Sequence, residues 1–81
     1  MQVTIEFFGV LRQLAGATHL ELALAPDSPV ADALAQIAQR YPGLAGRLHD
    51  TACAIGDSLV RRDALLSEGQ RLALIPPVSG G

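Results

Sequence analysis

One amphipathic helix constrains the fold more than any other stretch of this sequence. Between residues 30 and 41, apolar residues recur at intervals of three, four and seven, the spacing that lines one side of a helix. Ser28 followed by Pro29 is a typical helix start, with the Ser28 hydroxyl expected as the N-cap, and Pro42-Gly43 ends the pattern. The expected helix has one apolar side to bury, made of Val30, Ala33, Leu34, Ile37, Ala38 and Tyr41.

Strand patterns occur on both sides of this helix in the sequence. Apolar and polar residues alternate over residues 2–8 and 18–25 before it, and over residues 71–75 after it. Residues 52–55 read as a further short strand that turns into residues 59–60. Between the first two strands we expect a short helical turn closed by Gly16, in which Leu11 and Leu14 cover one end of the core.

The order strand, strand, long helix, strand, strand is typical of the β-grasp fold. We therefore predict an α+β domain in which a mixed sheet packs on one main helix, with the first and last strands parallel and adjacent at its centre. A sequence of 81 residues, 49% of them hydrophobic, is consistent with a single domain. Residues 1–75 are expected to form this domain and residues 76–81 an extended tail.

Composition argues against several classes of function. All six basic residues are arginines, scattered apart from one adjacent pair, so the sequence lacks the basic stripe that nucleic-acid binding needs. It shows neither a signal-peptide pattern nor an apolar run near 18 residues, so we expect a cytoplasmic protein that does not enter a membrane. The only cysteine, Cys53, excludes an intrachain disulfide and is interpreted as a buried hydrophobe. His19 is expected to be solvated, and with no Cys/His cluster we expect no metal site.

The last seven residues of the sequence combine stiffness with flexibility. Pro76 and Pro77 fix φ near extended values, and Pro76 disfavours a helical conformation at Ile75. Gly80 and Gly81 have no Cβ and therefore little bulk. A stiff stem with a thin tip suits insertion into a narrow channel of another protein, where the terminal carboxylate would be the reactive group.

Two residues place apolar groups on the outer faces of their strands. Phe8 lies on the otherwise polar side of the first strand, and Ile75 lies on the outer side of the last. If these strands are neighbours, the two side chains form an apolar patch where the tail departs, a plausible docking surface.

Several motifs resemble those of the small subunit of molybdopterin synthase, a family of ubiquitin-like sulfur carriers. The resemblance covers essentially the whole sequence. It rests on Phe7-Phe8 followed by the segment 11–16, on segment 55–60 with Gly56 where the family often has Asn, on segment 66–70, and on the closing Pro-Pro-Val-Ser-Gly-Gly.

This resemblance implies a non-catalytic sulfur-donor subunit of a heterotetrameric sulfurtransferase. Because a carboxylate is a poor acyl electrophile, an E1-like adenylyltransferase would use ATP to adenylate Gly81. A sulfur donor would then convert Gly81 to a thiocarboxylate. The tail would insert into the large subunit of the synthase and donate sulfur to cyclic pyranopterin monophosphate. No cofactor would be bound permanently.

By the same resemblance, two groups of residues carry the function. Gly80 and Gly81 take part in the chemistry, and the partner contacts are Phe8, Arg12, Ile75, Pro76, Pro77, Val78 and Ser79. As an isolated surface residue, Arg12 would otherwise be read as pointing into solvent.

Three alternatives remain open from the sequence. The chain could be a related sulfur carrier for tRNA thiolation or another acceptor. It could be a modifier attached to lysines of other proteins, although without a lysine of its own it could not form lysine-linked chains of itself. It could also be a β-grasp interaction module with an inert tail.

Overall fold

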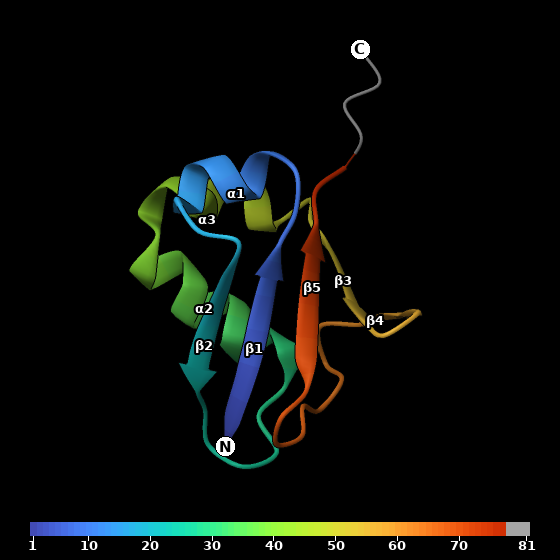
Figure 1. Cartoon of the computed structure of the whole chain (residues 1–81). Helices are drawn as coiled ribbons and strands as arrows, with labels where there is room; N and C mark the ends of the chain where they lie inside the picture. Colours follow the sequence, from blue (N-terminus) through green and yellow to red (C-terminus); the bar gives the residue numbers. More distant parts are fainter. Residues whose placement is uncertain (78–81) are drawn as a thin grey trace.

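The computed structural model describes residues 1–77. Figure 1 shows one sheet with a long helix on one face and short helices at one end. The elements in chain order are β1 (Gln2–Phe7), α1 (Val10–Ala15), β2 (His19–Ala23), α2 (Val30–Arg40), the 3₁₀ helix η1 (Pro42–Leu44), α3 (Ala45–Leu48), β3 (Ala52–Ile55), β4 (Ser58–Val60) and β5 (Arg71–Ile75).

The sheet has the predicted mixed topology. Its strand order is β2-β1-β5-β3-β4. β1 and β5 pair in parallel with Phe7 opposite Leu74, while β2, β3 and β4 join by antiparallel pairing. A five-stranded mixed sheet packed on one main helix is the β-grasp, ubiquitin-like fold, so the predicted fold class is confirmed.

The core lies between the inner face of the sheet and α2. Inward-facing residues alternate along β1 and β5, as expected for strands with one buried face. The apolar side of α2 covers them, and the Phe7 ring meets the Tyr41 ring edge-on with centroids 5.8 Å apart. The fully buried large residues are Val3, Ile5, Phe7, Leu11, Leu22, Val30, Ile37, Leu44, Cys53, Leu66, Leu72 and Leu74.

The start of α2 differs from the prediction. The Ser28 hydroxyl does not cap the helix; it donates to the Ala25 carbonyl at 2.7 Å, and Pro29 is the N-cap residue. The first helical N–H groups instead meet a distant segment, with Val30 N–H donating to the Ala64 carbonyl and Ala31 N–H to the Arg62 carbonyl, both at 2.9 Å. A backbone segment distant in sequence therefore does the work expected of a local side chain.

One leucine also differs from the prediction. Leu11 of α1 is fully buried, but Leu14 is 42% exposed, because the short helix presents only one side to the core. Later in the chain Leu66 is buried, whereas its neighbour Leu65 is largely exposed. The predicted left-handed C-cap at Gly16 is confirmed, with φ of 69°.

The end of the sheet near α1 carries the features that matter for function. In Figure 1 the arrows of β1 and β5 point toward the same end of the molecule, where α1 lies and where the chain leaves β5. No helix in the described part of the chain has the length and apolar character needed to span a membrane.

Candidate functional site

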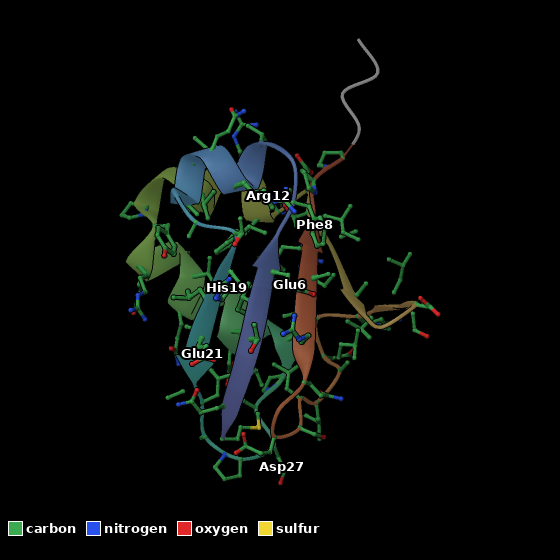
Figure 2. The ribbon with its side chains drawn as sticks, viewed as in Figure 1. Glu6, Phe8, Arg12, His19, Glu21 and Asp27 are labelled. Carbon is green, nitrogen blue, oxygen red and sulfur yellow. The ribbon has the colours of Figure 1, made fainter. Side chains whose placement is uncertain are left out.

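Phe8 and Ile75 occupy neighbouring positions where the two central strands end. They follow the paired residues Phe7 and Leu74, and both are partly exposed, at 37% and 39%. Figure 2 shows Phe8 beside the upper end of β5. The structure therefore brings together the two residues that the sequence singled out, and their contact with a partner stays a prediction.

The apolar surface extends further across the sheet than the sequence indicated. In the sheet register Glu6 lies opposite Ala73, Ala73 opposite Ala54, and Ala54 opposite Leu59. Because residues opposite one another share a face of the sheet, these side chains lie on the outer face away from α2. Leu59 is 74% exposed, the largest value among the exposed large hydrophobic residues of the described chain.

We call the exposed or half-buried apolar residues of this face the outer apolar patch, which consists of Phe8, Leu59, Ala73 and Ile75; Ala54 lies between Ala73 and Leu59 in the register but is buried. The sequence did not predict that Leu59 belongs to this patch, because alternation within the three-residue strand β4 does not indicate which face is exposed. The patch borders the ion pair between Arg71 and Glu6, whose nitrogen and oxygen lie 3.1 Å apart. An apolar surface with a charged rim is typical of a protein docking site.

Arg12 is exposed, and its side chain lies against Phe8. Its Nε donates a hydrogen bond to the Phe7 carbonyl at 2.9 Å. Its guanidinium carbon is 5.3 Å from the centroid of the Phe8 ring, within the range of a cation–π contact. Figure 2 labels the two residues close together at the end of β1. The expectation of a surface arginine is confirmed, but Arg12 is not isolated, since the turn after β1 folds α1 back over the strand end.

Pro76 and Pro77, which we call the stem, leave the body against the turn between β1 and α1. Gly9 in this turn has φ of 57° and ψ of −136°, a backbone conformation that favours glycine. A Cβ on Gly9 would lie only 3.0 Å from Cγ of Pro76. Gly9 therefore allows the stem to pack closely on the turn, a contact that the sequence did not predict.

An open pocket with a volume of about 430 Å³ lies beside the stem. It carries one basic and one acidic residue from the region of α3, and its lining comprises Val10, Gly46, Arg47, Asp50, Pro76 and Pro77. A partner that binds the stem could therefore also contact this pocket.

The described residues offer no nucleophile poised for catalysis. Cys53 is buried on the inner face, where burial raises the pKa of its thiol and the nearby Arg62 charge opposes that shift. A thiol with a raised pKa is a weaker nucleophile at neutral pH, consistent with its interpretation as a buried hydrophobe. His19 is exposed and its Nδ1 lies 3.2 Å from the Thr18 hydroxyl.

Val78, Ser79, Gly80 and Gly81 lie outside the described residues. The geometry therefore defines the base of the site: the outer apolar patch, the Arg12–Phe8 contact and the stem.

These features define a ubiquitin-like β-grasp protein with a docking surface next to its final strand. The model of the ThiS family matches residues 5–81, and the chain belongs to this family. It is 31% identical to the molybdopterin synthase sulfur carrier subunit of Chlamydomonas reinhardtii, over 100% of both chains.

Solved structures similar to this chain include a small archaeal modifier and a complex of molybdopterin-converting factor subunits. The crystal structure of the small archaeal modifier protein SAMP1 from Haloferax volcanii superposes with a TM-score of 0.91, at 25% identity and full coverage of both chains. A complex of subunits 1 and 2 of the molybdopterin-converting factor from Helicobacter pylori includes a chain that is 30% identical, again with full coverage of both chains and a TM-score of 0.69. The protein is therefore of the ubiquitin-like type that includes sulfur carriers and small archaeal modifiers.

Proposed function

We propose that this protein is the sulfur carrier subunit of a molybdopterin synthase and that Gly81 bears the transferred sulfur. The observation that carries the proposal is the outer apolar patch at the base of the stem, in a chain of this family. A carrier must dock in turn on an activating enzyme and on a synthase subunit, and one patch beside the tail serves both encounters. The Helicobacter pylori complex supports this, since a related chain is seen there with a second subunit.

The chemistry follows from the weak electrophilicity of a carboxylate. A carboxylate oxygen of Gly81 attacks the α-phosphorus of ATP in the active site of an E1-like adenylyltransferase, and pyrophosphate leaves. A sulfide-equivalent donor then attacks the acyl carbon and AMP leaves, which gives a thiocarboxylate. In the large subunit the thiocarboxylate donates its sulfur to cyclic pyranopterin monophosphate, and hydrolysis restores the carboxylate. The carrier contributes the acyl group and the docking surface, while ATP and the acceptor bind to its partners.

Intact mass spectrometry tests the proposal. The full chain is incubated with ATP, an E1-like activating enzyme and a sulfide donor, and the fraction of protein about 16 Da heavier is measured, the mass of one oxygen replaced by sulfur. Loading is expected in the wild type and is expected to be lost on deletion of Gly81, with the thermal unfolding curve unchanged. Loading that persists without Gly81 would show that the assigned site is wrong.

A pair of surface variants tests the docking patch separately. Phe8→Ala removes an apolar side chain within the patch, whereas Leu14→Ala removes one of similar exposure, 42% against 37%, on α1. We expect the first to raise the carrier concentration needed for half-maximal loading and the second to leave it unchanged. Equal effects of the two variants would remove the evidence for the patch.

A second candidate function is that of a protein modifier. It is favoured by the TM-score of 0.91 with the small archaeal modifier protein. In that case activated Gly81 would form isopeptide bonds with lysines of other proteins. Because the last trypsin site of this chain is Arg71, tandem mass spectrometry of a trypsin digest would detect these bonds as residues 72–81 attached to a lysine. Transfer of sulfur to the pterin without such conjugates would favour the carrier over the modifier.

A further inference from the structure

The geometry points to Arg12 as a positioning residue for Phe8, which holds the aromatic ring in the orientation that a partner meets. This inference rests on the proposed docking role of the outer apolar patch. It assigns to Arg12 an action inside the carrier itself, through the ring beside it.

The first observation is the anchoring of the guanidinium. Arg12 Nε donates to the Phe7 carbonyl at 2.9 Å, and this bond joins the middle of α1 to the last residue of β1. The register of β1 with β2 ends at Glu6 opposite His19, while Phe7 still pairs with Leu74 of β5 and its N–H donates to the Thr18 carbonyl at 2.9 Å. Arg12 therefore supplies a donor to the carbonyl of the last β1 residue, where the paired register with β2 has ended.

The second observation is what the anchored group covers. With Nε fixed on Phe7, the guanidinium carbon lies 5.3 Å from the centroid of the Phe8 ring. The preceding side chain, Phe7, is fully buried and edge-on to Tyr41, so the backbone beneath Phe8 is held firmly on the inner side. Phe8 is held on its outer side by Arg12, and its 37% exposure is the part left for a partner.

The third observation is that Arg12 has no competing engagement among residues 1–77. Its side chain forms no ion pair there, and its hydrogen bond to the Phe7 carbonyl comes from Nε alone. A lysine could either donate to the Phe7 carbonyl or lie over the ring, because its ammonium is a single point of charge, whereas the planar guanidinium does both. The geometry thus requires arginine specifically.

A double-mutant cycle tests the inference in the full chain. Arg12→Ala, Phe8→Leu and the double variant are compared in the loading assay with the activating enzyme, and Arg40→Ala, which removes an exposed arginine on α2, is the charge-matched control. Because cation–π contacts at exposed sites are weak, we expect Arg12→Ala to raise the half-saturating carrier concentration about two- to fivefold. We expect no such rise from Arg12→Ala in the Phe8→Leu background, an intermediate rise for Arg12→Lys, and no change in the maximal loading rate.

Multiplicative effects of the two substitutions would overturn the inference, because they would mean that Arg12 contacts the partner independently of Phe8. An absence of any effect of Arg12→Ala would overturn it equally.

A measurement without any partner separates this inference from the proposed function. Ring carbon and proton resonances of Phe8 are recorded by NMR in the wild type, Arg12→Ala, Arg12→Lys and Arg40→Ala. We expect the Phe8 ring signals to shift and its ring motion to increase in Arg12→Ala but not in Arg40→Ala. If the wild type fails to load sulfur while the ring responds in this way, the proposed function fails and the positioning role stands; an unchanged ring refutes the positioning role.

Discussion

Arg62 and Arg61 are neighbours in sequence with opposite structural roles, and their substitution gives a sharp test of this structure. Arg62 Nη2 donates to the Leu48 carbonyl at 2.7 Å and to the Thr51 carbonyl at 2.9 Å. Within residues 1–77 the Arg61 side chain pairs only with Asp63, at 3.3 Å, with both side chains at least 75% exposed. The first arginine joins the segment before β5 to the end of α3, whereas the second lies on the surface.

The expected magnitude follows from these bonds. A hydrogen bond to a charged group contributes about 1.5–3 kcal/mol when shielded from water, and we take about 1 kcal/mol for each bond here because the residue is largely exposed. Arg62→Met keeps the apolar part of the side chain and should lower the free energy of unfolding by about 2 kcal/mol. In a domain of this size that corresponds to a fall in Tm of roughly 10 °C. Arg61→Met removes a surface ion pair and should cost below about 0.5 kcal/mol.

Urea denaturation followed by circular dichroism, together with thermal unfolding, measures both variants. Arg62→Lys serves as a further comparison: its single ammonium cannot reproduce the geometry of the guanidinium, so its stability should fall between Arg62→Met and the wild type. Equal losses for Arg61→Met and Arg62→Met would refute the reasoning, since they would show that the two bonds to the carbonyls contribute nothing measurable.

Further predictions concern a buried thiol, two matched leucines and two matched glycines. Burial raises the pKa of the Cys53 thiol, so the unfolded chain loses that proton at lower pH than the folded one. Stability should therefore decline as pH rises above about 8.5, and this decline should be smaller in Cys53→Ala, as measured by urea denaturation between pH 7 and 10. Leu72→Ala, at a fully buried strand position, should lower the free energy of unfolding by about 2–5 kcal/mol. Leu59→Ala, at a position 74% exposed, should change it by no more than about 0.5 kcal/mol. Similar losses for the two variants in urea titrations would contradict the assigned faces of the sheet. Gly16→Ala should destabilise the protein by about 1 kcal/mol because φ at Gly16 is 69°. Gly46→Ala, within α3 and with open space at Cβ, should be neutral or slightly stabilising. Equal thermal unfolding of the two variants would refute the conformational argument.

Local sequence patterns were sufficient to predict the fold class and its main elements. Alternation over residues 71–75 and the three-four spacing of residues 30–41 are local patterns, because each follows from the geometry of a strand or a helix. They predicted the final strand and the main helix, and their order implied the β-grasp arrangement. The left-handed C-cap at Gly16 was also readable, since it depends on one residue and its neighbours.

The contacts between segments distant in sequence could not be predicted from those patterns. The N–H groups at the start of α2 bond to the carbonyls of Ala64 and Arg62 rather than to Ser28, because the chain returns past the helix start. Leu59 belongs to the outer apolar patch only through the register β1–β5–β3–β4, in which a shift by one residue would turn it to the other face. Arg12 reaches Phe8 only because α1 folds back over β1. Such contacts depend on pairing between strands and turns that are distant in sequence, and a local sequence pattern does not identify which distant residue will be contacted.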